Sequence, residues 1–256
     1  MKLHLFHFSP TGLVRALNQL VAGYKLCSRH GARLRDFVPG SIPSMTAAWN
    51  FSLLLKEYCL AKPKTIIDAG ANASQMTKLL MLECEPDVSI FSFEPNAGLL
   101  PIGTRFELAL SDEDGEAQLV GCDEDDLWGK IEERGPVEGA SRGTVVRMAR
   151  FDTLVEKSEF TMSQAPRPVL LKIDAEGHEL RIVKGFGRHM NEMDYLLCEI
   201  ENRSESGGNY SLSEMCGQLS RFGFDNSRVL YACYDGPLAP AHMDVLFWRG
   251  TVGSRC

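Results

Sequence analysis

Residues 64–95 read KTIIDAGANASQMTKLLMLECEPDVSIFSFEP, and this stretch decides the fold that the sequence predicts. Its β-branched run, Thr65 to Ile67, is typical of a buried strand and closes in the turn DAGAN at residues 68–72. A helical segment over about 74–83 follows, and a second apolar strand, Val88 to Phe93, ends in Glu94 and Pro95. A strand, a glycine-containing turn, a helix and a second strand in this order predict an α/β sheet.

The carboxyl ends of these two strands form a predicted nucleoside-binding half-site. Ligands of open α/β sheets bind where strands end and helices begin. No side chain keeps a ligand from the backbone at Gly70. Glu94 lies at the tip of the neighbouring strand, where a carboxylate can accept hydrogen bonds from both hydroxyls of a ribose. The candidate cofactor contacts here are Asp68, Gly70, Ala71, Asn72, Glu94 and Pro95.

The turn argues against a dinucleotide cofactor. The motif G-x-G-x-x-G places a pyrophosphate on a helix N-terminus, but Asn72 and Gln75 stand where its second and third glycines belong. The sequence has no Walker pattern either. Asp68 would repel a phosphate and suits a cationic ligand. S-adenosylmethionine has a ribose, no phosphate, and a cationic sulfonium and ammonium, so it is the predicted cofactor.

Composition limits the class of protein. The 256 residues, 44% of them hydrophobic, suit one α/β domain with a sizeable core. A formal charge of −7 without a Lys/Arg stripe argues against a nucleic-acid partner. The sequence has no run of 18 apolar residues, and Met1 to Phe8 is too short for a signal peptide, so we expect no membrane partner. Eight cysteines without a C-x-x-C pair or zinc-like spacing are typical of a reducing cytoplasm, the expected location.

We expect a helical N-terminal extension over residues 1–62 and the α/β domain over residues 63–256. Leu13 to Tyr24 and Met45 to Leu60 predict the two helices of the extension. Glycine and proline between residues 96 and 104 argue against a full crossover helix there, and one strand is expected over residues 105–110. Strands at 117–121 and 144–150, around an acidic and glycine-rich loop, predict a hairpin-like insertion at about 112–150. The remaining predicted elements are strands at 169–173, 195–200, 229–233 and 245–248, the last two antiparallel, and helices at 176–190 and 212–222.

A dense group of ionisable residues follows the strand at 169–173. Because uncompensated charge is costly to bury, this density predicts a site. Asp174 would face the cleft beside the sulfonium, and His178, one helical turn further, has a side chain suited to a general base. Alternatively, Asp174 caps the following helix. The five ionisable residues are Lys172, Asp174, Glu176, His178 and Glu179.

Three further parts of the sequence have two interpretations each. Glu199, near the end of the next strand, contacts the substrate or pairs with Lys172. Ser111 and Asp112 contact an adenine amino group or form a turn. The acidic run 123–126 could hold a cation, but a solvated loop is favoured, so no metal site is predicted.

At several motifs over roughly residues 65–201, the chain resembles the FkbM family of S-adenosylmethionine-dependent methyltransferases. The motifs are residues 67–72, 93–96, 109–112, 151–154, 171–180 and 198–200. The resemblance implies a Rossmann-like class I methyltransferase fold, with a seven-stranded, mostly parallel sheet and an antiparallel last strand. It also implies that Asp68, Gly70, Asn72 and Glu94 bind the cofactor, with Ser111 and Asp112 near its adenine. The chain departs from the family at Ser74, where glycine is common, and at residues 96–104, where the family has a helix.

The resemblance implies O-methylation of a hydroxyl on a sugar, polyketide or other small molecule. Our first hypothesis is that His178, Asp174 or Glu199 assists deprotonation of that hydroxyl. N- or C-methylation stays open, as does a homo-oligomer. A nucleoside-binding protein without chemistry is a second hypothesis, against which the ionisable group at residues 172–179 speaks. A nicotinamide-dependent oxidoreductase is the third, and the missing glycines argue against it.

Overall fold

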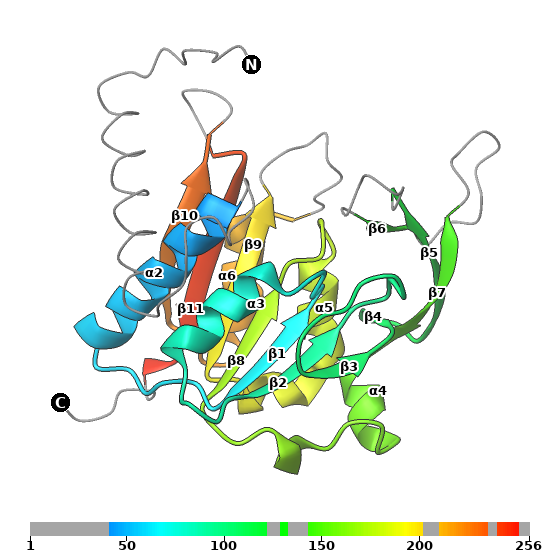
Figure 1. Cartoon of the computed structure of the whole chain (residues 1–256), viewed down its shortest axis with the longest axis horizontal. Helices are drawn as coiled ribbons and strands as arrows, with labels where there is room; N and C mark the ends of the chain where they lie inside the picture. Colours follow the sequence, from blue (N-terminus) through cyan, green and yellow to red (C-terminus); the bar gives the residue numbers. More distant parts are fainter. Residues whose placement is uncertain (1–40, 122–128, 133–142, 202–209, 235–239, 251–256) are drawn as a thin grey trace.

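The computed structural model describes residues 41–121, 129–132, 143–201, 210–234 and 240–250. A seven-stranded sheet with the order β10-β11-β9-β8-β1-β2-β3 forms its centre (Figure 1). All neighbouring strands are parallel except β11, which runs antiparallel to both β9 and β10. The predicted sheet is therefore confirmed. The strands are β1 (Thr65–Ala69), β2 (Ser89–Phe93), β3 (Thr104–Phe106), β8 (Val169–Ile173), β9 (Tyr195–Glu201), β10 (Asn226–Cys233) and β11 (His242–Trp248).

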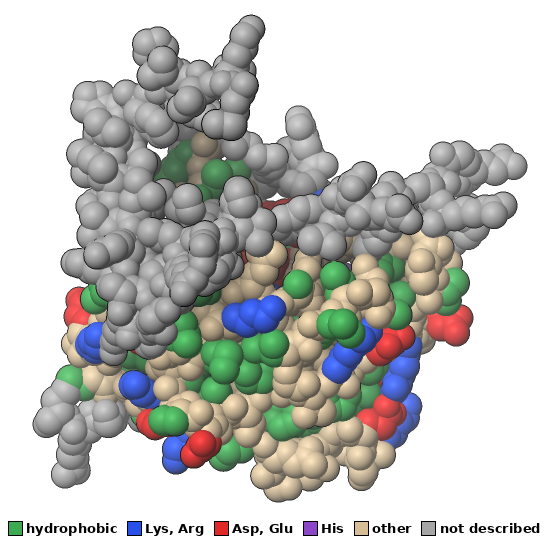
Figure 2. All heavy atoms as spheres, viewed as in Figure 1, with side chains coloured by type: hydrophobic (Ala, Val, Ile, Leu, Met, Phe, Trp, Pro, Cys, Tyr) green, Lys and Arg blue, Asp and Glu red, His purple; other side chains and the backbone are tan. Residues whose placement is uncertain are grey.

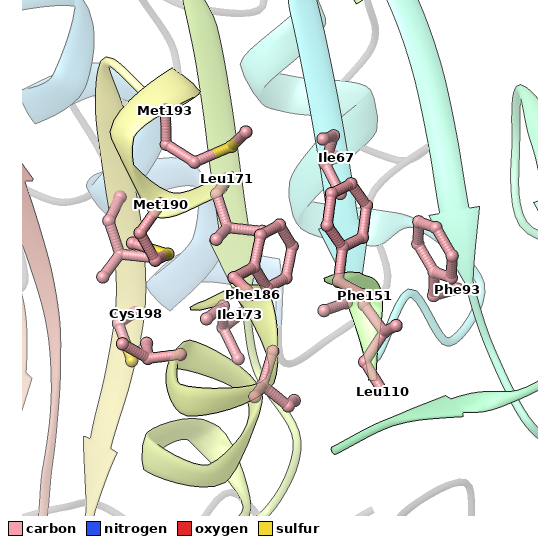
Figure 3. Close-up of a cluster of buried hydrophobic side chains, with 14 of the residues drawn as sticks. Ile67, Phe93, Leu110, Phe151, Leu171, Ile173, Phe186, Met190, Met193 and Cys198 are labelled. Carbon is pink, nitrogen blue, oxygen red and sulfur yellow. The ribbon is translucent and has the colours of Figure 1, made fainter. Parts of the chain in front are cut away.

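Helices cover both faces of this sheet because its strands are apolar on both sides. Ile66 and Leu170 belong to the buried cluster that includes residues of α2 and α3, whereas Ile67 and Leu171 belong to the cluster on the other face. Figure 3 shows that second cluster, in which the ring of Phe151 stacks on Phe186 at 4.0 Å between centroids. The helices are α2 (Ser41–Glu57), α3 (Gln75–Leu80), α4 (Phe151–Glu156), α5 (Glu179–Phe186) and α6 (Leu212–Ser220), with 3-10 turns at Met81–Glu83, Met162–Gln164 and Gly187–Glu192.

A second, four-stranded sheet lies beside the end of β3 (Figure 1). β5 and β7 pair antiparallel, as expected for the two strands of the predicted hairpin, and the insertion and its bounds stay a prediction. The single strand predicted over residues 105–110 is wrong: the chain leaves β2 after Phe106, and Ala109 and Leu110 pair with β7 instead. Most of the glycine-rich loop, including 123–126, lies outside the described residues. The strands of this sheet are β4 (Ala109–Leu110), β5 (Gly115–Val120), β6 (Lys130–Glu132), which was not predicted, and β7 (Thr144–Ala149).

The predicted N-terminal extension is described only in part. The helix predicted over Leu13 to Tyr24 lies outside the described residues, whereas the one over residues 45–60 is α2. Phe51 and Leu54 of α2 are buried in the same cluster as Ile66, so α2 packs on the main sheet. The division at residues 62 and 63 stays a prediction. As predicted, residues 96–104 form no helix.

Three further observations concern membrane-spanning helices, surface charge and one cysteine. Within the ranges that the structure describes, no helix combines the length and apolar character needed to cross a bilayer. On the face in Figure 2, Lys and Arg side chains are scattered among Asp and Glu rather than gathered in a stripe. Cys59 is disulfide-bonded, which the expectation of reduced cysteines did not include, because spacing along a sequence does not show which thiols meet in space.

Candidate active site

A pocket opens at the carboxyl ends of β1, β2 and β8, where the sequence predicts the ligand. It encloses about 690 Å³ of empty space, part of it open to solvent. Polar groups line one part of it, and apolar side chains from the main sheet, α5 and the second sheet line the rest. The lining residues are Gly70, Asn72, Phe93, Glu94, Pro95, Asn96, Leu99, Ala109, Leu110, Leu119, Gly129, Ile131, Asp174, Ala175, Glu176, His178 and Ile182.

The turn after β1 touches both neighbouring strand ends. The Gly70 amide donates to the carbonyl of Phe93 at 3.0 Å, and the Asp174 amide donates to the carbonyl of Ala69 at 3.1 Å. Gly70 has a φ of +72°, and a Cβ added there would lie 1.9 Å from the carbonyl oxygen of Asp174. This position therefore requires glycine, both for its backbone conformation and for the close approach of the two segments.

Glu94 is held in the wall of the pocket by the backbone. One carboxylate oxygen accepts from the amide of Asn72 at 2.7 Å and the other from the amide of Asn96 at 2.8 Å. Burial raises the pKa of Glu94, which is 6% exposed, and the two backbone hydrogen bonds oppose that shift. Because a carboxylate has about four acceptor sites, the group retains capacity for a ligand hydroxyl.

Two residues of the same turn adopt a left-handed backbone without being glycine. Asn72 has a φ of +47° and Ser74 a φ of +56°. The Asn72 side chain accepts a hydrogen bond from the amide of Ala73 at 2.6 Å, which is a local role of the kind that asparagine favours in this conformation. The hydroxyl of Ser74 accepts a hydrogen bond from the amide of Ile102 at 3.2 Å. Side-chain bonds to the backbone thus accompany both strained positions.

Asp68 is absent from the residues that line the pocket, and its predicted contact with the cofactor stays a prediction. The residue is 0% exposed within β1, and its register partner on β8 is Lys172. The Lys172 ammonium lies 3.0 Å from one carboxylate oxygen, and the Thr77 hydroxyl donates to the other at 2.6 Å. The sequence does not show the contact with Lys172, because this residue lies about 100 residues further along the chain than Asp68.

The segment after β8 is a loop rather than the start of a helix. Glu176 and Gly177 have φ values of +52° and +94°, so the predicted helix at 176 begins only at Glu179. The buried Glu179 carboxylate accepts from the amides of Ala175 and Gly177, both at 3.0 Å, and from the Tyr210 hydroxyl at 2.7 Å. Glu179 therefore shapes the loop, and this loop presents Asp174, Glu176 and His178 to the pocket.

His178 lines the pocket but faces a protein partner. Its Nε2 lies 2.9 Å from the hydroxyl of Ser111, and the residue is 8% exposed. Burial lowers the pKa of His178, so its imidazole is neutral at pH 7. Neither Ser111 nor Asp112 lines the pocket: Ser111 is buried behind His178, and Asp112 pairs with Arg181. Their predicted contact with adenine stays a prediction, and Ala71 likewise lies outside the lining.

Three carboxylates meet where β8 and β9 end. Asp174, Glu176 and Glu199 each offer an oxygen within 4.8 Å of the others, a spacing that could also hold a metal ion. Burial and the neighbouring Asp174 raise the pKa of Glu199 to about 10, and the same two causes raise that of Glu176 to about 7. Glu199 is therefore protonated at pH 7, which argues against its predicted role as a base. Lys172 does not pair with Glu199 but contacts Asp68 and Asp174, the latter at 3.4 Å.

This group gives the free energy of unfolding a measurable pH dependence. The folded chain keeps the proton of Glu199 up to about pH 10, whereas the unfolded chain releases it near 4.5. Stability from this group is therefore full below pH 4.5 and is lost as pH rises through the folded pKa. From pH 7 to about 8.5, we expect a loss of up to ~2 kcal/mol in urea denaturation. Glu199→Gln should flatten the slope, and an unchanged slope in that variant would contradict the assignment.

Comparison with known proteins places the chain in one family. The family model described as the methyltransferase FkbM domain matches residues 68–225, more than half of the chain. No curated protein matches the sequence.

Three solved structures are similar to the chain at low identity. An O-methyltransferase from Bacillus cereus in complex with SAH is 10% identical, with 91% of each chain covered and a TM-score of 0.39. The O-methyltransferase TomG from Streptomyces achromogenes is 8% identical, covering 91% of this chain and 90% of TomG, with a TM-score of 0.39. A precorrin-6y C5,15-methyltransferase from Geobacter metallireducens is 11% identical, covering 78% and 87%, with a TM-score of 0.35. With TM-scores below 0.5, these similarities carry no weight in assigning a reaction to this chain.

Proposed function

The chain belongs to the FkbM family of S-adenosylmethionine-dependent methyltransferases, and from this premise we propose that it methylates a hydroxyl oxygen of a small-molecule acceptor. The observation that carries the proposal is that Glu94 and Asp174 line one pocket. A carboxylate that can bind a ribose, Glu94, and a carboxylate that can take a proton from the substrate, Asp174, thus line the same pocket. A site of this kind supports group transfer rather than binding alone.

The lining residues fit the cofactor by their chemistry. Glu94 offers acceptor sites to a ribose diol, and Asp174 offers negative charge to the sulfonium and ammonium. Apolar side chains such as Leu110 and Ile131 suit the faces of an adenine ring. When bound, S-adenosylmethionine supplies a methyl group made electrophilic by its positive sulfur. We assign the cofactor to Gly70, Asn72, Glu94, Pro95 and Asp174.

We propose that Asp174 is the base that takes the proton from the hydroxyl group to be methylated. It lines the pocket beside Gly70, and its side chain is 36% exposed, so it is accessible to a substrate. Glu199 stays protonated beside it and can donate a hydrogen bond to Asp174, orienting that carboxylate. His178, whose Nε2 bonds Ser111, is the second candidate base; its neutral imidazole also suits holding the loop at residues 174–178.

Glu94→Ala should weaken binding of S-adenosylhomocysteine by roughly 10–100-fold, because hydrogen bonds to a charged group contribute about 1.5–3 kcal/mol. The variant also frees the amides of Asn72 and Asn96. Calorimetric titration of wild type and variant measures the change. A matched control is Glu85→Ala, which removes an acidic side chain absent from the pocket lining. Equal affinity in the Glu94 variant and wild type would contradict the ribose assignment.

The reaction itself is tested by incubating the full chain with S-adenosylmethionine and a panel of sugar and polyketide alcohols. We expect S-adenosylhomocysteine to form with at least one alcohol, and mass spectrometry with NMR to place the new methyl group on oxygen. The matched deoxy compound, which lacks that hydroxyl, should give no product. Methyl transfer only to nitrogen or carbon of panel members carrying amines or acidic carbons would contradict O-methylation. Binding without turnover of any compound would favour a protein that only binds the nucleoside.

A further inference from the structure

We propose that Lys172 is a positioning residue that fixes the distance between the two backbone walls of the cofactor site. The inference rests on the proposed cofactor site at the ends of β1 and β8. Lys172 is 5% exposed and does not line the pocket, so it acts on a ligand through the residues that it holds.

The ammonium of Lys172 contacts both walls at once. It donates a hydrogen bond to the carbonyl of Gly70 at 2.9 Å, in the turn after β1. It also lies 3.4 Å from the carboxylate of Asp174, in the loop after β8. The third contact, at 3.0 Å, is with the carboxylate of Asp68 inside β1. Three donors of one ammonium thus serve three oxygens on two neighbouring segments.

These contacts lie where the regular sheet pairing ends. The paired register of β1 and β8 ends at Ala69 and Ile173. Beyond these residues, one segment continues toward α3 and the other enters the loop before α5. One further backbone hydrogen bond, from Asp174 to Ala69, joins them. The close approach of Gly70 to Asp174 limits how near the two segments can come. Lys172 limits how far they can part, since it holds both.

The charge of Lys172 suits this role. Burial lowers the pKa of the amine, but the charges of Asp68 and Asp174 outweigh burial and raise the pKa overall. The residue therefore stays protonated throughout the neutral range. A protonated, buried ammonium with three oxygen neighbours has little freedom to move, because each departure leaves a charged group unpaired.

The test must separate positioning from loss of the fold, because Lys172→Met alone leaves Asp68 buried and unpaired. The double variant Asp68→Asn/Lys172→Met removes both charges of the buried pair, a change that folds tolerate. We expect it to keep its circular dichroism spectrum and to bind S-adenosylhomocysteine roughly 10–100-fold more weakly in calorimetry, the range known for residues that orient the ligands of a metal ion. The KM for S-adenosylmethionine should rise in parallel.

Two further variants separate geometry from charge and stability. Arg167→Met breaks an ion pair with the buried Asp194 at the opposite end of β8 and should leave the affinity unchanged. Lys172→Arg keeps the positive charge, but a planar guanidinium does not reproduce three contacts made by one nitrogen. We expect Lys172→Arg to melt near the wild-type temperature and still to bind weakly.

The outcomes are distinct. Wild-type affinity in the folded double variant, or in Lys172→Arg, would overturn the positioning role while leaving the cofactor site in place. Equal weakening by Arg167→Met would overturn it too, because the effect would then result from stability alone. A wild-type chain that binds no S-adenosylhomocysteine would instead overturn the proposed function, and this inference with it.

Discussion

Replacing Asp174 by asparagine should lower kcat by about 10²–10⁴-fold, the range that a positioned general base contributes. The substitution keeps the size of the side chain and an oxygen for Lys172, whose ammonium lies 3.4 Å from the carboxylate. It removes the ability to take a proton from the acceptor. The affinity for S-adenosylhomocysteine should change much less than kcat, because this product is a thioether and lacks the positive sulfur that the Asp174 charge would attract. Single-turnover kinetics beside calorimetry separate the two quantities.

A control and a second variant make this prediction specific. Glu159→Gln neutralises a carboxylate that pairs with Arg147 and lies outside the pocket lining, so kcat should not change. If Asp174→Asn retains the wild-type kcat while His178→Ala loses it, the proton acceptor is His178 and the assignment to Asp174 is wrong.

Gly70→Ala should destabilise the chain by about 2–5 kcal/mol, the sum of a left-handed backbone penalty and overpacking. The new Cβ would lie 1.9 Å from the carbonyl oxygen of Asp174, which is backbone and cannot rotate away. The loop after β8 must then move, and binding of S-adenosylhomocysteine should be lost with it. Urea denaturation measures the first effect and calorimetry the second.

Gly217→Ala provides the matched control for Gly70. Gly217 lies inside α6, and a Cβ added there meets no atom within 4 Å. Alanine is a better helix former than glycine by up to ~1 kcal/mol, so this variant should be as stable as wild type or more so. If both variants behave alike, the tight contact between Gly70 and Asp174 is not present in solution.

The parts of the fold that local pattern determines could be predicted from the sequence. The buried runs at β1, β2 and β8 are continuous and apolar, and the turn at Gly70 and the acidic tip at Glu94 come directly after them. The absence of a helix at residues 96–104 was expected from glycine and proline. These features depend on residues that are close in sequence, so secondary-structure propensity and the spacing of apolar residues are enough to predict them.

The features that depend on distant partners could not be predicted. The sequence does not show the contact of Asp68 with Lys172, because this partner across the strands is remote in sequence. The sequence likewise does not show the contact between the Ser111 hydroxyl and His178, because that contact depends on how α5 packs. The helix start at Glu179 was missed because the positive φ of Glu176 is set by the Glu179 carboxylate rather than by propensity. The sequence places Glu176 in the group of ionisable residues after β8, but only the fold shows that it lines the pocket.

A crystal structure of the full chain with S-adenosylhomocysteine tests the central claim most directly. It should show the nucleoside in the pocket at the ends of β1, β2 and β8, with both ribose hydroxyls within about 3.2 Å of the Glu94 carboxylate. Protein side chains filling that pocket, or the nucleoside bound elsewhere, would contradict the account.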